Sequence, residues 1–543
     1  MSRRLRWILS LGIVLSLAVI PIALAQPTSA AHTSASAGRA PAARAASASA
    51  TVPQQRGVRR IPHQPSALAP NAVAAPRVSD QRVATSTAPL LASFNGVSSR
   101  DSAVTNFGAE FEPPDQGLCS GNGYVVEMVN SAYTIYKPDG TVVTGPYNVN
   151  GPFDEGLSEF TSDPRCHYDA ATHTWYATIL YINADSTQSR VDLAVNTSGD
   201  PTKAWTTYRI DTTDVGGSTG PKHTGCPCLG DQPTLGIDAS NVYVTTNEFS
   251  LQGPQFNGAQ IYAIPQNDLV MAGPTATPAH FVHFDNLNVG GAVAASVQPA
   301  LTTKSAPAEY FLSSLDPNGT FDQRIGVWAM TNAAGIDKGI KPTLSSYVMP
   351  SEAYGVPPGA EQKGSSSLLD AGDDRMQQVQ YIDGHVWGAL DTSVTIPNDP
   401  AARAGAAWFK VTPTLSKGVV TGASARQGYV ATAGNYVLYP AIQSAPDGKT
   451  VMAFSLSSAT RFPSAAYAVL DPGATAFGPV TVAAAGTGSY DPTATRWGDY
   501  SWAVLDPSGK GVWAATEYIP PAASQTPDGR RNWGTRVYEV ATP

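Results

Sequence analysis

The sequence is poor in charge, in cysteine and in long apolar runs, and each shortage excludes a class of protein. Only 14% of its 543 residues are charged, and only four are cysteine. After residue 24 no apolar run approaches the roughly 20 residues that a bilayer-spanning helix needs, so we expect no stable membrane span in the processed chain. Sustained helical periodicity is also scarce, which argues against a helical fold.

The N-terminal part of the chain has the composition of segments that precede a folded domain. Residues 1–25 have the form of a signal peptide, because three arginines precede an apolar run that closes on Ala23-Leu24-Ala25. A membrane anchor is the alternative, since the run is nearly long enough to span. Residues 26–87 are rich in Ala, Ser, Thr and Pro with almost no aromatic residues, which predicts a disordered leader. A processed pro-segment is the rival interpretation.

The remaining chain is strongly acidic. Residues 88–543 carry 24 Lys and Arg against 41 Asp and Glu, a net charge of −17. This balance argues against a nucleic-acid partner and mildly favours neutral sugars, cationic ligands or Ca²⁺. An acidic surface that keeps an exported protein soluble is an equally good explanation.

Residues 88–543 should form one all-β domain. Short alternating or apolar runs bounded by Gly, Asn, Asp and Pro recur throughout, and no linker-like composition interrupts them. One sequence unit recurs seven times. Each copy begins with a polar residue and continues with a short strand, a turn and a second strand that carries an aromatic residue. The copies lie at 113–130, 162–180, 230–249, 296–316, 373–391, 435–457 and 496–518. This spacing is close to the blade length of a β-propeller, most simply one with seven blades, with six or eight as alternatives.

The last copy is the clearest, and the chain ends suggest how the ring closes. It should form a hairpin from strands at 501–505 and 511–516, with Asp506, Pro507 and Gly509 in the turn. Strand-like segments at 90–97 and 535–541 could pair with each other and remove the open sheet edges.

Several strings resemble a family of exported bacterial proteins with sialidase-like propeller repeats. They include Pro-Pro-Asp-x-Gly at 113–117, Gly-Asp-Gln-Pro at 230–233 and Arg-Trp-Gly-Asp-Tyr-Ser at 496–501, and the likeness spans residues 93–519. The resemblance implies an architecture and no particular reaction. The chain departs from true sialidases because it lacks Phe/Tyr-Arg-Ile-Pro and a complete Ser-x-Asp-x-Gly-x-x-Trp box, so cleavage of sialic acid is not implied.

All four cysteines lie in the domain expected to be exported, where disulfides can form. Cys119 and Cys166 occupy near-equivalent places in the first two copies, which favours a Cys119–Cys166 bridge and leaves Cys226 to pair with Cys228. Bridges from the Cys226/Cys228 loop to the first two copies stay open, because sequence cannot decide connectivity. A metal site with His167 or His223 fits no standard zinc spacing.

The polar residues that begin each copy should ring one mouth of the propeller channel. Paired carboxylates at such a mouth can act as acid and base on a glycosidic bond, or can hold Ca²⁺; no other cofactor is evident. The candidate catalytic residues are Glu248, Glu517, Asp231 and Asp499. The candidate ligand-binding residues are Arg165, Arg375, Arg496, Trp497, Asp163 and Asp374. For any single carboxylate the competing explanation is structural, since Asp routinely satisfies loop backbone.

The expected function is recognition of extracellular or cell-surface carbohydrate at this mouth, with or without cleavage, by a secreted and monomeric protein that could associate with the cell wall. The alternative is a non-catalytic structural, adhesion or protein-interaction propeller of the cell envelope. Whether the protein is an enzyme stays open at this stage, because fold alone does not imply function.

Overall fold

The computed structural model describes residues 60–62, 73–85, 90–217, 220–269, 277–278, 280–302, 304–315, 317–319, 321–490, 496–526 and 532–542. All of them belong to the unit Ala37–Pro543. The predicted signal peptide and most of the predicted leader lie outside the described residues.

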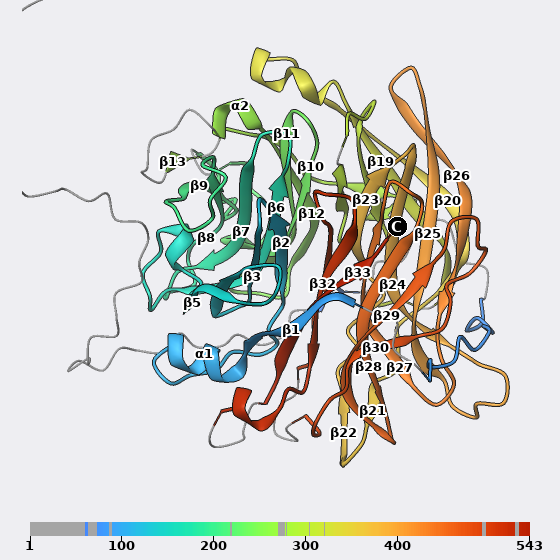
Figure 1. Cartoon of the computed structure of the whole chain (residues 1–543). Helices are drawn as coiled ribbons and strands as arrows, with labels where there is room; N and C mark the ends of the chain where they lie inside the picture. Colours follow the sequence, from blue (N-terminus) through green and yellow to red (C-terminus); the bar gives the residue numbers. More distant parts are fainter. Residues whose placement is uncertain are drawn as a thin grey trace, which may run out of the picture. The chain divides into compact units, whose positions relative to one another are not determined.

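The described chain is nearly all β, as the sequence predicts (Figure 1). Its helical segments are short: α1 (Ser99–Thr105), α2 (Gln266–Leu269) and the 3₁₀ segments η1 (Gly151–Phe153), η3 (Ala333–Lys338) and η4 (Ala522–Ser524). None of the described helices is long and apolar enough to cross a bilayer.

Among the described residues, the strands form seven groups of four, each antiparallel from strand to strand. Group 1 is β2 (Gly117–Gly121), β3 (Tyr124–Met128), β4 (Ala132–Tyr136) and β5 (Val142–Asn148). Group 2 is β6 (Phe160–Asp169), β7 (Thr174–Ile182), β8 (Ser189–Asn196) and β9 (Thr206–Asp211). Group 3 is β10 (Cys228–Ile237), β11 (Asn241–Ser250), β12 (Phe256–Pro265) and β14 (Val282–Phe284). Group 4 is β17 (Gln298–Thr302), β18 (Glu309–Ser313), β19 (Asp322–Thr331) and β20 (Thr343–Tyr354).

The C-terminal half of the chain supplies the other three groups. Group 5 is β23 (Met376–Ile382), β24 (His385–Val394), β25 (Arg403–Ser416) and β26 (Val419–Val430). Group 6 is β27 (Tyr436–Ser444), β28 (Thr450–Ser458), β29 (Arg461–Leu470) and β30 (Thr481–Ala484). Group 7 is β31 (Trp502–Leu505), β32 (Gly511–Tyr518) and β33 (Gly534–Ala541), completed by β1 (Leu90–Ser98).

Five further small strands of the described chain lie outside these groups. β13 (Thr277–Pro278) pairs with β9, and two short hairpins form from β15 (Asn288–Val289) with β16 (Ala292–Val293) and from β21 (Ala360–Gln362) with β22 (Ser365–Leu369).

The first strands of the groups contact one another in chain order. β2 contacts β6, β6 contacts β10, and the series continues through β17, β23 and β27 to β31. β31 contacts β2 in turn, so the first strands form a closed circuit. Within this circuit β10, β17 and β23 make parallel backbone pairs, such as Ile237 with Leu301 and Ala300 with Val379.

The two ends of the described domain meet in group 7, as predicted. β1 pairs antiparallel with β33, in a register that places Phe94 opposite Val537 (Figure 1). The predicted final hairpin is also present, since β31 pairs with β32 and Trp502 lies opposite Ala515. Because β1 covers the free edge of β33, the sheet formed by the last three strands gains a fourth strand.

Local sequence explains many of the reversals. Asn122-Gly123 connects β2 to β3 and Asp383-Gly384 connects β23 to β24, and in both pairs the two residues have positive φ. Two successive residues of this kind form the turn whose twist matches a tight antiparallel hairpin, and Asn-Gly and Asp-Gly adopt it readily.

Apolar clusters fill the spaces between neighbouring groups. Trp175 lies in a cluster with residues of groups 1 and 2, Tyr243 in one with groups 3 and 4, and Trp387 in one with groups 5 and 6. All three aromatic side chains are buried. Each group therefore buries its faces against its two neighbours.

Both disulfides have the pairing that the sequence favours. Cys119 of β2 is bonded to Cys166 of β6, and Cys226 is bonded to Cys228 at the start of β10. The first bridge joins the first strands of groups 1 and 2, while the second closes a loop around Pro227.

Parts of the expected leader make defined contacts, which differs from the predicted disorder of residues 26–87. Ile61 is buried against a cluster that includes Phe249, and its carbonyl accepts a hydrogen bond from Asn318 Nδ2 at 2.7 Å. Val78 is also buried, and its backbone N–H donates to the carbonyl of Thr395. The few apolar residues of this segment suffice because a preformed surface receives them.

Candidate functional site

The first residues of several repeated units have an unusual backbone conformation, and hydrogen bonds connect them to the preceding group of strands. Asp163, Ser296 and Tyr439 all have positive φ at or just before the first strand of a group. In each case the second strand of the preceding group, or the residues just after it, supplies an acceptor for the backbone N–H. The pairs are Asn130 Oδ1 with Asp163 at 2.7 Å, Asn247 Oδ1 with Ser296 at 2.8 Å and Asp391 Oδ1 with Tyr439 at 2.8 Å. Part of the repeated signal is therefore structural, as the competing explanation holds.

Three of the aspartates meet where the first strands begin. Carboxylate oxygens of Asp115, Asp163 and Asp499 lie within 4.8 Å of one another, and we call these residues the aspartate cluster. Asp115 and Asp163 are buried, whereas the Asp499 side chain is 33% exposed. Burial and then the charge of Asp499 raise the pKa of both buried carboxyls above its usual range.

Two arginines compensate this cluster. Arg496 forms an ion pair with Asp499. Arg165 is buried, with its guanidinium 3.0 Å from the centre of the Tyr500 ring, and burial lowers its pKa to about 9. Both guanidinium groups act on the buried carboxyls and oppose the rise in pKa, Arg496 at Asp115 and Arg165 at Asp163.

Ca²⁺, which the sequence allows as one possible ligand, does not fit this cluster well. Ca²⁺ takes six to eight oxygen ligands, and the cluster already faces two cationic side chains, Arg165 and Arg496. A further cation would meet their repulsion, so we assign no ion to the aspartate cluster.

A small pocket opens beside the aspartate cluster, and Asp499 is the cluster residue that lines it. We call it the Arg375 pocket; its lining includes Arg60, Gln232, Asp370, Arg375, Tyr439 and Asp499. Its volume is about 30 Å³, far below the roughly 300–1,000 Å³ of pockets that enclose a whole small ligand. The pocket can therefore enclose one substituent of a ligand, with the rest of the ligand outside.

Arg375 is held rigidly in this pocket. Its Nε and Nη2 donate to the two carboxylate oxygens of Asp373, each at 2.6 Å, and Nη1 donates to Gln232 Oε1. Burial alone would lower the pKa of Arg375, but the Asp373 carboxylate outweighs it and raises the pKa. The charge of Asp231 acts in the same direction, which places this predicted residue near Arg375 although it does not line the pocket.

Three other predicted residues are buried and have no exposed face for a ligand. Asp374 is fully buried next to the pocket-lining Asp373. Glu517 is also buried, and its Oε2 accepts the Gly498 N–H at 2.8 Å. Trp497, expected to stack on a sugar, is 1% exposed and packs edge-on against Tyr490 at 5.0 Å between ring centres. In this structure Glu517 and Trp497 shape the segment that carries Arg496 and Asp499.

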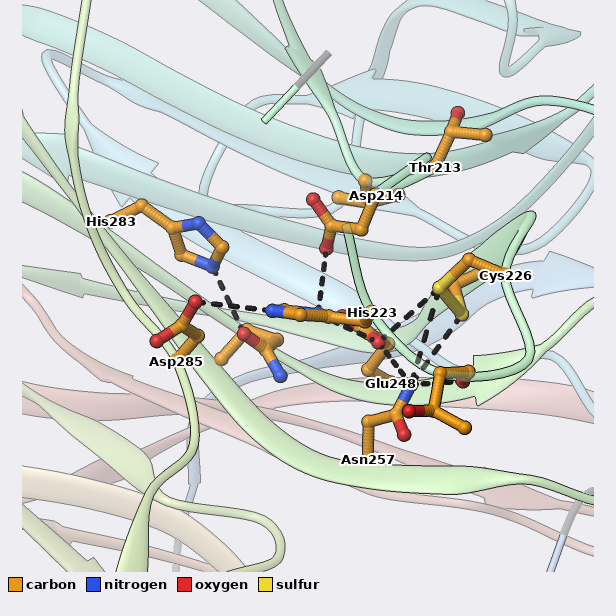
Figure 2. A network of polar contacts seen from close by, with 12 residues as sticks. Thr213, Asp214, His223, Cys226, Glu248, Asn257, His283 and Asp285 are labelled. Atoms are coloured by element: carbon orange, nitrogen blue, oxygen red, sulfur yellow. Dashed lines mark hydrogen bonds and ion pairs between the residues drawn. A yellow bond between two sulfur atoms is a disulfide. The ribbon is translucent and has the colours of Figure 1, made fainter. Parts of the chain in front are cut away.

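The fourth catalytic candidate, Glu248, belongs to a separate polar network, which Figure 2 shows. His223 Nδ1 lies 2.9 Å from Glu248 Oε2, and His223 Nε2 lies 3.1 Å from Asp285 Oδ2. Asp214 Oδ2 lies 3.6 Å from His223 Nδ1, and Asn257 Nδ2 donates to Glu248 Oε1 at 2.5 Å. We call these five residues the His223 network.

Carboxylates dominate the electrostatics of this network. Burial, followed by the neighbouring Glu248, raises the pKa of Asp214 to about 9. At His223 burial lowers the pKa, but hydrogen bonds and charge from Glu248 and Asp285 outweigh it, so the pKa is raised. His283 lies nearby, stacked on Tyr262 at 4.5 Å, and burial lowers its pKa to about 4.

A larger cavity lies at the opposite ends of the first strands. It has a volume of about 470 Å³, and its lining includes His167, Asp238, Lys304, Gln443 and Pro507, which lie at or near the turns that follow first strands. We call it the His167 cavity. Burial lowers the pKa of His167 to about 4, so this imidazole is neutral near pH 7.

Sequence reasoning missed several of these residues. Arg60 was assigned to the leader, yet it lines the Arg375 pocket. Arg60-Ile61-Pro62 matches the Arg-Ile-Pro part of the Phe/Tyr-Arg-Ile-Pro motif, and Arg59 stands where that motif has its aromatic residue. This partial match was a signal that could have pointed to Arg60. Asp214 and Asp285 lie 9 residues before and 62 residues after His223, a spacing that has no recognisable motif.

No family model and no curated protein matches the chain. The expected membership of an exported bacterial family therefore finds no support in these comparisons.

Solved structures give distant likenesses. The sialidase of Trypanosoma rangeli in complex with sialic acid has 9% identity and a TM-score of 0.37, over 77% of this chain and 59% of that one. The GH93 α-L-arabinofuranosidase of Fusarium graminearum in complex with arabinobiose has 10% identity and a TM-score of 0.27, over 70% and 92%. A Dyadobacter fermentans protein of unknown function has 12% identity and a TM-score of 0.30, over 83% and 99%. Likenesses this weak establish no activity for this chain.

Proposed function

We propose that this chain is a seven-bladed β-propeller that binds carbohydrate through the Arg375 pocket. The seven four-stranded groups, the closed circuit of first strands and the pairing of β1 with β33 support this architecture. In propellers the ends of the first strands converge, and functional groups collected there can act on one ligand.

The observation that carries the proposal is the mixture of polar groups in one open pocket. Arg60 and Arg375 offer only donors, Asp370 and Asp499 offer acceptors, and Gln232 offers both. Sugar hydroxyls donate and accept in the same way, so each can find a partner here. The small volume assigns the pocket to one sugar substituent, and the remaining glycan would lie across the neighbouring surface.

Cleavage is a second candidate, and a specific observation favours it. Asp370 and Asp499 both line the pocket, and the carboxyls of Asp115 and Asp163 behind Asp499 have raised pKa values. Hydrolysis of a glycosidic bond needs one protonated and one ionised carboxyl group at the scissile bond. Asp370 and Asp499 would be the two groups in contact with substrate, and the buried carboxyls of Asp115 and Asp163 would act on Asp499 from behind it.

We also propose that the protein is exported and works outside the cytoplasm. The two disulfides support an oxidising compartment. A structural or adhesion role in the cell envelope without glycan binding is the alternative that the following experiment distinguishes.

The test is a glycan array probed with the purified chain, followed by calorimetric titration of any bound oligosaccharide. We expect Asp499→Asn and Arg60→Ala each to weaken binding about tenfold or more, because each removes a polar partner at the pocket; tenfold corresponds to about 1.4 kcal/mol. Release of new reducing ends from the bound glycan would identify an enzyme, and intact glycan would identify a binding module.

Lys304→Ala is the matched control, because Lys304 lines the His167 cavity and its side chain is 69% exposed. Binding should be unchanged in this variant. Loss of binding in Lys304→Ala with full binding in the two pocket variants would move the site to the opposite end and refute the proposal. Full binding in all three variants, or no glycan bound at all, would refute it as well.

A further inference from the structure

Four segments of the chain form the His223 network. Asp214 and His223 both lie in the connection between β9 and β10, Glu248 lies on β11, Asn257 lies on β12 and Asp285 follows β14. Their side chains nevertheless converge, as Figure 2 shows. Neither the Arg375 pocket nor the aspartate cluster includes any of these residues.

We infer that Asp214, His223 and Glu248 bind a divalent transition-metal ion of the Zn²⁺ type. Potential ligand atoms of these three residues lie within 4.8 Å of one another. His223 Nδ1 is 2.9 Å from Glu248 Oε2 and 3.6 Å from Asp214 Oδ2. Ligands at the usual zinc distances lie about 3.3–3.6 Å apart in a tetrahedron, so small movements would admit the ion.

An unsatisfied buried oxygen points independently to a missing ligand. Asp214 is 1% exposed, and its Oδ2 accepts no hydrogen bond from any described residue. This oxygen faces the imidazole of His223, as Figure 2 shows. A buried carboxylate oxygen without a donor is costly, and a cation between Asp214, His223 and Glu248 would remove that cost.

The neighbouring residues hold the imidazole and carboxylate as metal ligands are commonly held. Asp285 Oδ2 lies 3.1 Å from His223 Nε2, so it can accept the proton of that nitrogen and leave the Nδ1 lone pair facing Asp214 and Glu248. Asn257 Nδ2 donates to Glu248 Oε1 at 2.5 Å, which orients the carboxylate.

Charge distinguishes this network from the aspartate cluster. Asp214, Glu248 and Asp285 form their ion pairs with His223, and none of them pairs with Lys or Arg within the part of the chain that the structure describes. The aspartate cluster, in contrast, has Arg165 and Arg496 close by. Three carboxyl groups therefore share one imidazole and no fixed cation, and a divalent ion would bind there by displacing the protons that they share.

The donor set selects the kind of ion. Imidazole nitrogen suits Zn²⁺, Co²⁺ and related ions, whereas Ca²⁺ and Mg²⁺ prefer oxygen ligands alone. Three protein ligands leave one tetrahedral position for water.

The test uses the full chain with its disulfides intact, stripped with a chelator and titrated with Zn²⁺ by calorimetry and with Co²⁺ by absorption spectroscopy. We expect one equivalent to bind and excess Ca²⁺ to leave it in place. His223→Ala and Asp214→Asn should weaken binding about a hundredfold or more, and Asp285→Asn about 10–100-fold as a positioning residue. Thermal unfolding in chelator checks that the variants fold.

Two controls separate this site from its surroundings. His283→Gln removes the other histidine of the region, whose ring centre lies 6.4 Å from that of His223, and should bind normally. Cys226→Ser/Cys228→Ser should also bind normally, because the proposed ligands include no sulfur. Absence of stoichiometric binding, equal loss in His283→Gln, or dependence on the cysteines would each overturn the proposal.

Discussion

Buried carboxylates on second strands accept backbone N–H groups from neighbouring segments. Each is buried and has no solvent to stabilise its charge, so the pKa of each carboxyl group is raised. The pairs are Glu127 Oε2 with Val97, Asp391 Oδ1 with Tyr439 and Glu517 Oε2 with Gly498, each at 2.8 Å. These buried acids therefore connect segments that are distant in sequence, and their ionisation is coupled to folding.

Glu127 makes this coupling measurable. Burial raises its pKa from 4.5 to about 7, so the folded protein binds more protons than the unfolded chain between these values. Stability therefore falls as the pH rises through this window, by up to about 3 kcal/mol at pH values above it. Glu127→Gln keeps an acceptor for the Val97 N–H and does not titrate. We expect it to resist urea better than the wild type near about pH 8 and to lose this advantage near about pH 5.

The control is Glu361→Gln, since the Glu361 side chain is 47% exposed. This variant shows what the same substitution does at an exposed side chain, and its effect at each pH is subtracted from that of Glu127→Gln. An advantage of Glu127→Gln that was equal at both pH values would contradict the coupling.

At the scale of elements, the beginning of a first strand is defined by backbone conformation as much as by side chains. Several first strands carry a register shift close to their start, such as those between Ser162 and Arg165, Asp231 and Thr234, and Leu438 and Ala441. Such bulges change the direction in which neighbouring side chains point. Gln232 and Tyr439, which lie inside two of these bulges, both line the Arg375 pocket.

Two glycines allow the cost of backbone strain and the cost of a steric clash to be measured separately. Gly123 and Gly498 have similar φ values, +78° and +72°. A Cβ on Gly123 would meet nothing within 4 Å, whereas a Cβ on Gly498 would lie 2.2 Å from the Tyr439 ring. We expect Gly123→Ala to cost about 1 kcal/mol and Gly498→Ala at least about twice as much, because overpacking adds to backbone strain. Urea unfolding measures both, and equal costs would show that Tyr439 moves aside freely.

At the scale of the whole domain, stability depends on closing group 7. β1 is far from β33 in sequence but supplies the last strand of its sheet. The backbone pairing extends from Leu90 with Val540 to Ser98 with Gly534. Without β1, β33 would present an open edge of unpaired backbone groups, which invites association with other chains.

Two truncations test this closure. A chain beginning at residue 90 keeps β1, and a chain beginning at residue 99 lacks it. We expect the shorter chain to unfold at lower urea concentration and to aggregate in size-exclusion chromatography, while the longer one stays monodisperse. Identical behaviour of the two chains would mean that β1 does not close the domain.

Much of the fold was predictable from the sequence because its signals are local. Turn residues such as Asn122-Gly123 and Asp506–Gly509 act within a few positions, and the repeated unit made the all-β class and the group spacing readable. The Cys119–Cys166 pairing followed from equivalent places in two copies. The contacts of residues 60–62 and 73–85 were not predictable, because a segment poor in apolar residues is ordered here only by the surface that receives it.

The sequence alone determined the elements: which runs form strands, where the chain reverses, and which side chains repeat at strand starts. Tertiary structure decided which polar residues share a site. It placed Asp115, Asp163 and Asp499 together, buried Glu517 and Trp497, and assigned Glu248 to His223. The physical reason is that strand and turn preferences act over a few residues, whereas the direction and burial of a side chain depend on bulges and on contacts between groups that are distant in sequence.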